Sequence, residues 1–365
     1  MAAETAVQFE ALERQAQTLM SVFTKAGHEA VAPAIIQPAD IFLDAVGETL
    51  RARTYVFTDP DGAELCLRPD LTLPTCRLHV ARHADAATTA RYCYNGPAFR
   101  FQPQGADEAH PREFRQCGIE RFGDRDKEAA DAETIALVIA ALERAGLKNW
   151  TLRIGDLGLF RAVLAAADLP ARWTQRLADA FWRPNSFRAE LKRMVAPPRD
   201  GERALPAELA RNLLAGNAEA SELAVAAYLE GNGVELIGTR TLAELADRLM
   251  SLARDANAQP LDPAAARLIE SYVGVQGPAR VSGEKVAALL KGARGGTGRA
   301  LEAYDRRLAL LANAGIDLDR VGFSAEFGRT LEYYTGLVFE VLAPGLKADT
   351  PVAGGGRYDN LLRLA

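Results

Sequence analysis

The sequence lacks several features that would assign it to a specialised class of protein. Its 365 residues contain four cysteines and no Cys-x-x-Cys pair, so a disulfide framework is not indicated. No stretch approaches the roughly 18 consecutive apolar residues of a membrane helix, and the first ten residues carry Glu4 and Glu10 without a basic start or an apolar run. Lysine and arginine number 43 against 48 aspartate and glutamate residues, which argues against a chain that coats nucleic acid. These absences predict a cytoplasmic globular protein.

Strand-like patterns occupy both ends of the chain, and the middle is helical. Between about Leu157 and Ala314 the sequence is rich in Ala, Leu, Arg and Glu, as is typical of helices. Strand patterns precede this region and return only after it, and a short helix is predicted at Tyr358–Leu364. This order predicts an α+β domain formed by residues 1–156 and 319–365, interrupted by a mostly helical insertion at 157–318.

Two long helices are predicted in the first part of the chain. The first precedes Gly27, and its apolar residues recur with the spacing of a helical period: Phe9, Leu12, Ala16, Leu19, Met20 and Phe23. The second runs from about Glu128 to Gly146, where the glycine ends it, with Asp124 or Asp126 as its N-cap.

Two predicted strands carry polar residues where a core strand would not. They span Tyr94–Gln102 and Arg112–Phe122, and the polar loop Pro103–Pro111 joins them as an antiparallel pair. Because side chains alternate, one face of the pair collects these residues: Ala98, Arg100, Gln102, Phe114, Gln116, Gly118, Glu120 and Phe122. This pattern fits either a solvated sheet surface or a covered cleft.

Three other motifs favour structural over chemical interpretations. Lys291–Gly298 is rich in glycine but lacks the ending of a phosphate-binding loop, so a flexible connection is favoured. His79 and His83 have helical spacing without a third ligand, which favours packing over zinc binding. Three cysteines fall in predicted strands and are expected to behave as small buried hydrophobes: Cys66, Cys93 and Cys117. The sequence therefore predicts no metal site, no cofactor and no catalytic residue.

The segment Phe327–Glu340 places charge beside an apolar strand predicted at Thr335–Leu342. Arg329 precedes two tyrosines in this segment, and a buried arginine needs an anion or a carboxylate as its partner. The partner is either a ligand or an internal carboxylate, from Glu332 or Glu326. Both alternatives remain open at this point.

Five segments of the sequence together resemble a known family. They occur in this order along the chain: Leu67–Thr72, Gly96–Gln102, Arg112–Glu120, Leu331–Glu340 and Gly354–Asp359. The set resembles the catalytic core of histidyl-tRNA synthetases over about Phe9–Asp156 and from Asp319 onward. The resemblance implies a class II synthetase-like fold, in which a mostly antiparallel sheet is flanked by helices. Pro33 lies where that class places its motif 1 proline, which implies a homodimer within a hetero-oligomer.

Departures from the family pattern decide which function the resemblance implies. Arg100 matches the motif 2 arginine, but Gln102 stands at the glutamate position and His110 at that of the loop arginine. The chain also ends at Ala365, before the motif 3 arginine and the anticodon-binding domain would appear. Such losses are similar to those of the regulatory subunits of ATP phosphoribosyltransferase, which partner a short catalytic subunit in the first step of histidine biosynthesis. The resemblance therefore implies a non-catalytic regulatory subunit that binds histidine, with no tRNA or membrane contact.

The positions that hold the amino acid in the family are matched here by eight residues: Asp70, Thr72, Arg100, Gln116, Glu120, Arg329, Tyr333 and Tyr334. The carboxylate of histidine needs a guanidinium, for which Arg100 is the candidate. Its ammonium needs acceptors, which Asp70, Thr72 and Gln116 supply; Asp70 stands where the family has a glutamate.

The imidazole of the ligand needs a carboxylate and a hydroxyl. Glu120 and one of Tyr333 or Tyr334 are the candidates, and Arg329 is expected to face the opposite edge of the ring. Two alternative functions remain open: an active histidyl-tRNA synthetase or related amino-acid-activating ligase, and a stand-alone histidine-binding protein.

Overall fold

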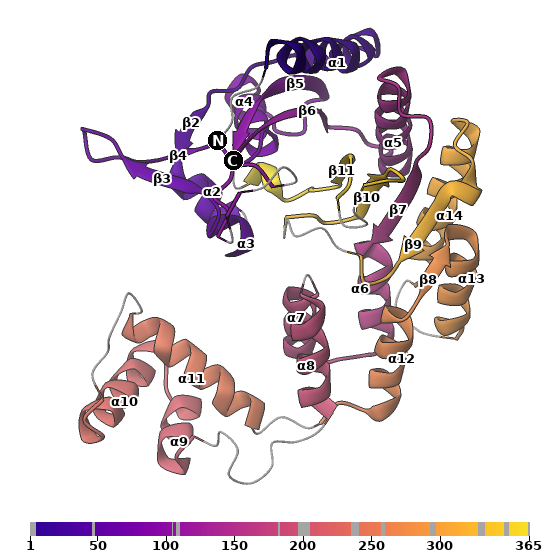
Figure 1. The fold of residues 1–365 in the computed structure, drawn as a ribbon. Helices are drawn as coiled ribbons and strands as arrows, with labels where there is room; N and C mark the ends of the chain where they lie inside the picture. The colour runs from indigo at the N-terminus through magenta and orange to yellow at the C-terminus, as the bar shows by residue number, and fades with distance from the viewer. Residues whose placement is uncertain are drawn as a thin grey trace. The chain divides into compact units, whose positions relative to one another are not determined.

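A computed structural model describes most of the chain as two compact units (Figure 1). The first unit combines the two ends of the chain, Met1–Asp168 and Leu268–Ala365, and the second is Leu169–Arg267. The described residues are 5–45, 48–103, 105–106, 110–181, 183–195, 205–234, 241–256, 260–292, 297–327, 333–346 and 350–363.

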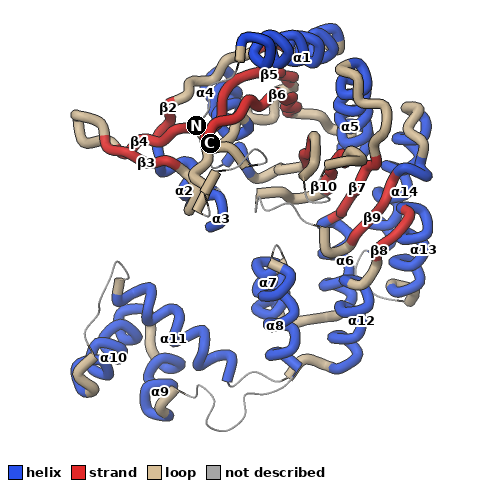
Figure 2. The backbone as a smooth tube through the Cα atoms, viewed as in Figure 1, coloured by secondary structure: helices blue, strands red, loops and turns tan. Residues whose placement is uncertain are grey.

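The strands of the first unit form three sheets in the described residues (Figure 2). One sheet has the order β1 (Glu29–Ala30), β5 (Ala90–Phe99), β6 (Glu113–Phe122), and another β2 (Ile36–Pro38), β4 (Glu64–Leu67), β3 (Tyr55–Thr58). The largest has the order β11 (Ala353–Gly356), β10 (Leu337–Leu342), β7 (Thr151–Asp156), β9 (Val321–Ser324), β8 (Gln276–Pro278). Of the pairings in this part of the chain, β1–β5 and β7–β9 are parallel and six are antiparallel. The arrangement agrees with the predicted mostly antiparallel α+β fold.

The helices of the first unit surround these sheets. They are α1 (Ala6–Lys25), α2 (Ala39–Ala45), α3 (Glu48–Arg51), α4 (Thr72–Arg82), α5 (Lys127–Arg144), α6 (Leu157–Ala166), α13 (Ala279–Leu289) and α14 (Thr297–Asn313), with 3-10 turns η1 (Leu318–Arg320) and η2 (Leu361–Arg363). On one face of β5 and β6, Phe23 of α1 and Ala141 of α5 pack against Cys93. Figure 1 shows α1 beside β5 and β6. Because α1 and α5 cover this face, the opposite face of the pair is left for polar side chains.

The second unit is helical throughout its described residues. It contains α7 (Ala171–Ala180), α8 (Pro184–Val195), α9 (Ala207–Ala215), α10 (Ala218–Gly231) and α11 (Leu242–Ala256), and α12 (Pro263–Val273) crosses its C-terminal boundary. Leu213, Val225 and Ala246 form part of a core shared by α9, α10 and α11. Near the end of α11, Asp255 pairs with Arg172 and Arg176 of α7.

The helical unit is shorter than the insertion predicted at 157–318. Helices α6, α13 and α14 belong to the first unit, where they pack beside the largest sheet. Buried aromatic contacts explain this assignment: Phe160 of α6 stacks on Tyr272, and Tyr304 of α14 meets Phe323 of β9 edge-to-face. Residues 157–318 are mostly helical as composition predicts, but composition carries no information on which core each helix joins.

The ends of α5 have the predicted capping residues. Two segments near the C-terminus differ from the prediction. Asp126 caps α5 by accepting from the backbone N–H of Ala129 at 3.1 Å, and Gly146 follows the helix with φ of +107°. The strand predicted from Thr335 begins at Leu337, and the Thr335 N–H donates to the carbonyl of Arg357, the residue that follows β11. Of the helix predicted at 358–364, the described residues show the 3-10 turn η2.

Candidate functional site

A cavity of about 760 Å³ within the first unit includes the polar face of β5 and β6, and its lining continues past β6 to Phe23 of α1 and Ala141 of α5. The start of α4, the loop after β11 and the start of α5 also line it. Seven of the eight residues predicted to hold a ligand line this one cavity: Asp70, Thr72, Arg100, Gln116, Glu120, Tyr333 and Tyr334. The eighth, Arg329, lies outside the described residues, as does its alternative partner Glu332. Of the two interpretations of the polar face, the structure shows the covered cleft.

The register of the two strands brings the polar side chains together. Gln116 lies opposite Gly96, Gly118 opposite Tyr94, and Glu120 opposite Tyr92, so all of them share one face. Glycine at two of these positions leaves room for neighbouring side chains. A Cβ at Gly96 would lie 2.6 Å from a nitrogen of the Arg68 guanidinium, and one at Gly118 would lie 2.7 Å from the Tyr94 hydroxyl. The strand pair is therefore shaped to admit large side chains over its own backbone.

Glu120 is the most enclosed carboxylate on this face, with 5% of its surface exposed. The Tyr94 hydroxyl donates to its Oε1 at 2.9 Å, and the Tyr358 hydroxyl donates to its Oε2. Burial raises the pKa of Glu120 to about 7, although hydrogen bonds from Tyr358, Thr72 and Tyr94 act in the opposite direction. The group therefore changes charge near neutral pH.

Asp70 is a second buried carboxylate of the cavity, with 2% of its surface exposed. Its Oδ1 accepts from the backbone N–H of Leu73 at 3.3 Å, near the start of α4. Its Oδ2 is buried and meets no hydrogen-bond donor among the described residues. Burial raises the pKa of Asp70, and the charge of Arg100 opposes that shift. An unpaired buried carboxylate oxygen in a cavity is suited to a cationic ligand group.

Arg100 is one of several cationic side chains that line the cavity, and it lies near the buried Asp70 carboxylate. Its Nε donates to the carbonyl of Pro69 at 2.9 Å, and its guanidinium carbon lies 4.9 Å from the ring centroid of Phe114. Gln116 fixes the adjoining backbone, because its Oε1 accepts from the N–H of Leu71 at 3.1 Å. Its amide nitrogen lies 3.5 Å from the Tyr94 hydroxyl, to which it donates.

Three tyrosines come to the cavity from the C-terminal part of the chain. The rings of Tyr333 and Tyr334 lie 4.9 Å apart, and Tyr333 meets Tyr358 edge-to-face at 6.1 Å. Gly356 permits this approach, because a Cβ there would lie 2.7 Å from the carbonyl of Leu337 and 2.8 Å from the ring of Tyr334. Hydroxyl donors and aromatic surface therefore meet the carboxylates of the strand pair.

Sequence reasoning missed two side chains that line the cavity, Tyr94 and Tyr358. Tyr94 lies in phase with Ala98 and Arg100 on the predicted strand, so the two-residue period carried the signal for it. Tyr358 follows the glycines of Gly354–Asp359, a segment that the resemblance had singled out. No local pattern reveals that its hydroxyl reaches Glu120, because the two residues are 238 positions apart in the sequence.

The residues that depart from the family's ATP-binding motif have other contacts. Gln102 is buried, accepts a hydrogen bond from Arg53 at 2.5 Å, and donates to the carbonyl of Pro111 at 3.0 Å. Its amide thus joins the two ends of the polar loop to the segment before β3. His110 lies at the end of that loop and is exposed.

The weaker motifs have the predicted structural roles where the structure describes them. His79 stacks on Phe122 at 4.3 Å and contacts the carbonyl of Ala86, so it packs in the core. Cys66 and Cys93 are buried free thiols, whereas Cys117 is a partly exposed one. A search of the described residues finds no metal-binding cluster. Residues 293–296 of the glycine-rich stretch lie outside the described part. Within the described chain, every helix is too short or too polar to cross a membrane.

The fold and the cavity define a class II, histidyl-tRNA synthetase-like protein. A family model described as histidyl-tRNA synthetase matches residues 5–297 and 247–365. A histidine–tRNA ligase subunit from Alicyclobacillus acidocaldarius superposes with a TM-score of 0.59 and 25% identity, over 100% of this chain and 89% of that one. An ATP phosphoribosyltransferase regulatory subunit/histidyl-tRNA synthetase from Bacillus halodurans C shares the fold, with a TM-score of 0.69 and 22% identity over 100% of this chain and 76% of that one. These matches confirm the predicted fold class.

Sequence relatives narrow this class to one family. A protein of Mesorhizobium japonicum is 36% identical over 350 residues, which cover 96% of this chain and 91% of the relative. One of Agrobacterium fabrum is 38% identical over 333 residues, 90% of this chain and 85% of the relative. Both are named ATP phosphoribosyltransferase regulatory subunit. The chain belongs to the family of ATP phosphoribosyltransferase regulatory subunits, which confirms the predicted family and its regulatory rather than catalytic character.

Proposed function

We propose that this chain binds histidine in the cavity on β5 and β6 and regulates a short catalytic subunit of ATP phosphoribosyltransferase in the cytoplasm. The observation that carries the proposal is the chemistry of the cavity, whose lining includes the buried carboxylates of Asp70 and Glu120, the guanidinium of Arg100 and several phenols. Free histidine presents an ammonium, a carboxylate and an imidazole, and each finds a complementary group in that set.

The ligand groups can be assigned to individual side chains. The ammonium is matched by the unpaired Oδ2 of Asp70, and the ligand carboxylate by Arg100. The imidazole is matched by Glu120, whose oxygens already accept from phenol hydroxyls. In this assignment Thr72, Gln116, Tyr333 and Tyr334 complete the wall around the ligand, and Arg329 remains the predicted contact to its far edge.

Titration calorimetry with free histidine tests the binding half of the proposal. We expect saturable binding to the wild-type chain, and Glu120→Ala should weaken it by about 2 kcal/mol or more, since a charge-assisted hydrogen bond is lost. Glu113→Ala, an exposed position on the same strand, is the matched control and should bind as the wild type does. Failure of the wild type to bind histidine would remove the proposed ligand.

The regulatory half needs the catalytic subunit in the assay. We expect histidine to inhibit the reconstituted complex, and Glu120→Ala to blunt inhibition while leaving basal activation nearly intact. If Glu120→Ala abolished binding yet the complex stayed fully sensitive to histidine, the inhibitory site would lie on the catalytic partner. A chain that binds histidine but never changes the transferase rate would instead be a stand-alone histidine-binding protein.

The main competing function is amino-acid activation with ATP. Gln102 argues against it, because the amide at this position joins Arg53 to the carbonyl of Pro111 where the family's motif has a glutamate. We expect the purified chain to catalyse no histidine-dependent pyrophosphate exchange and to need no tRNA. Exchange clearly above a protein-free blank would favour a ligase.

We also propose that two copies of the chain associate through the sheet formed by β2, β4 and β3. Apolar side chains are exposed along it, with Ile36 52% and Phe57 38% accessible. Sedimentation at micromolar concentration should give a dimer, and Ile36→Asp should give a monomer. Val281→Asp, which replaces an exposed valine of α13, should leave the mass unchanged. A wild-type monomer would contradict the proposal.

A further inference from the structure

Thr335 ties together the two segments that bring tyrosines to the cavity. It directly follows Tyr333 and Tyr334, and its backbone N–H donates to the carbonyl of Arg357 at 2.6 Å. Its hydroxyl accepts from the N–H of Asp359 at 2.8 Å. Both residues that flank Tyr358 are therefore hydrogen-bonded to Thr335. A displacement of Tyr333, Tyr334 or Tyr358 would shift the backbone at Thr335.

Helix α6 is bonded to the same place. The side chain of Arg161, in the second turn of α6, donates to the carbonyl of Thr335 at 2.7 Å. The N–H of Leu157, its first residue, donates to the carbonyl of Gly336 at 3.2 Å. The helix thus has a direct hydrogen-bonded connection to the segment that carries Tyr333 and Tyr334.

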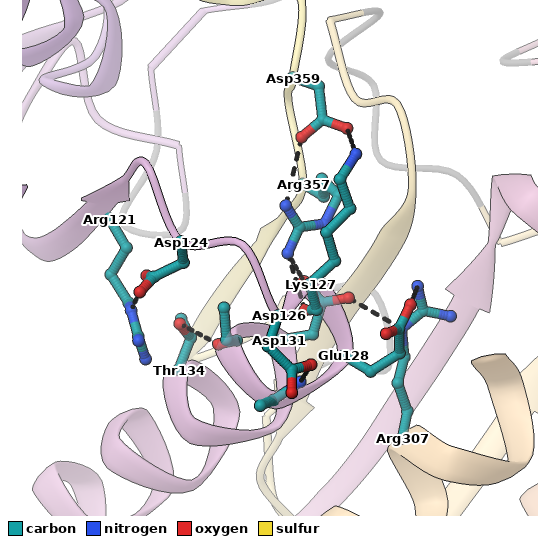
Figure 3. A network of polar contacts seen from close by, with 12 residues as sticks. Arg121, Asp124, Asp126, Lys127, Glu128, Asp131, Thr134, Arg307, Arg357 and Asp359 are labelled. Carbon is teal, nitrogen blue, oxygen red and sulfur yellow. Dashed lines mark hydrogen bonds and ion pairs between the residues drawn. The ribbon is translucent and has the colours of Figure 1, made fainter. Parts of the chain in front are cut away.

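A chain of largely buried charges makes a second connection to the start of α6, and Figure 3 shows its members Arg357, Asp131 and Arg307. Arg357 donates to Asp131 of α5 at 2.6 Å, and Arg307 of α14 donates to the other oxygen of Asp131 at 2.8 Å. Arg307 also donates to Asp156 at 2.8 Å, and Asp156 caps α6 through the N–H of Gly158 at 2.7 Å. Because buried charges are costly to leave unpaired, these side chains fix one another's positions.

We infer that α6 responds to occupancy of the cavity, through the Arg161–Thr335 hydrogen bond and the Arg357–Asp131–Arg307–Asp156 chain. The inference rests on the proposed function for its ligand. An imidazole that binds Glu120 competes with or reorients the Tyr358 hydroxyl, which now occupies Oε2. That change is passed to Arg357 and Thr335, and from there to α6. The helix ends at the junction with the second unit, near Asp168, so it is placed to carry the effect along the chain.

Hydrogen exchange of the full-length chain with and without histidine tests this inference, because helix amides report local opening. In the wild type, histidine should slow exchange at least about fivefold in peptides of α6, and by less in α13, which belongs to the same unit. Arg161→Ala should cut the slowing in α6 by at least half while protection of β5 and β6 persists. Arg161→Lys, which keeps a donor for Thr335, should restore most of it.

The inference has a matched control variant and specific results that would overturn it. Arg144→Ala, which removes an exposed arginine from the end of α5, is the matched control and should behave as the wild type does. Equal slowing in the wild type and Arg161→Ala would overturn the inference, as would protection of β5 and β6 without any in α6. If histidine protected none of these elements, the proposed ligand would fail, and the inference with it.

Discussion

The hydroxyl of Tyr94 lies directly over Gly118 of the neighbouring strand, where a Cβ would approach it to 2.7 Å. From this position the hydroxyl donates to Oε1 of Glu120 at 2.9 Å and accepts from the amide of Gln116 at 3.5 Å. The missing side chain at Gly118 is therefore part of the site, because it lets a phenol cross the strand to reach the carboxylate.

Gly118→Ala should displace the Tyr94 ring and weaken histidine binding by about tenfold or more, since about 1.4 kcal/mol of lost interaction suffices. The free energy of unfolding should fall by about 1 to 3 kcal/mol, the usual cost of overpacking. Calorimetry and urea denaturation measure the two effects. Gly231→Ala is the control, because a Cβ there meets nothing within 4 Å. Unchanged histidine affinity in the Gly118→Ala variant would contradict this account of the strand pair.

Asp70→Asn should weaken histidine binding without lowering the free energy of unfolding. The substitution removes the charge that the proposed ammonium needs, and histidine affinity should fall by about 2 kcal/mol or more. The free energy of unfolding should not fall, because a buried carboxylate with an unpaired oxygen is replaced by a neutral amide. Asp61→Asn, at an exposed turn position, is the control for charge alone. A large loss of stability in Asp70→Asn would show that this carboxylate serves the fold and not a ligand.

The raised pKa of Glu120 predicts an unusual dependence of stability on pH. Its folded-state value of about 7 exceeds the ordinary 4.5, so the folded chain retains a proton that the unfolded chain has lost. The contribution of this group to stability is therefore complete below about pH 4.5 and is lost as pH rises to about 7, at a cost of about 3 kcal/mol.

Glu120→Gln should remove this dependence, because the amide resembles the neutral acid. Urea denaturation at about pH 5 and about pH 8 should show that the wild type loses about 2.5 kcal/mol relative to the variant over this interval. Glu113→Gln on the same strand, with an exposed side chain, should follow the wild type. Parallel curves for the wild type and Glu120→Gln would mean that Glu120 is ionised in the folded chain across the whole interval.

Local signals in the sequence predicted which side chains line the cavity better than they predicted the contacts between distant segments. Strand alternation placed Gln116 and Glu120 on one face, and the resemblance named Asp70 and Arg100, all of which line one cavity. Contacts over long sequence separations were not accessible to such reasoning. The reach of Tyr358 to Glu120 depends on how β11 and the segment after it pack against β10, and periodicity carries nothing about that packing.

The same limitation applies to the question of which unit each central helix joins. Helices α6 and α14 have the composition of the helices in the second unit, yet Arg307 and Asp156 anchor them to the sheet unit. A buried ion pair contributes to such an assignment, and no window of local sequence contains both of its members. The end of α6 that adjoins the second unit also carries a backbone conformation that is uncommon outside glycine.

Asp168, which follows α6 and ends the first unit, has a φ of +49°, the left-handed region that favours glycine. Asp168→Gly should therefore raise the free energy of unfolding by about 0.5 to 1 kcal/mol, because the backbone conformation no longer opposes a Cβ. The reciprocal change is Gly146→Ala at the end of α5, where φ is +107° and a Cβ would meet nothing within 4 Å. That variant should lose about 1 kcal/mol or more for conformational reasons alone. Thermal denaturation of both variants against the wild type measures the pair, and a destabilised Asp168→Gly chain would show that the aspartate side chain contributes more than its backbone strain costs.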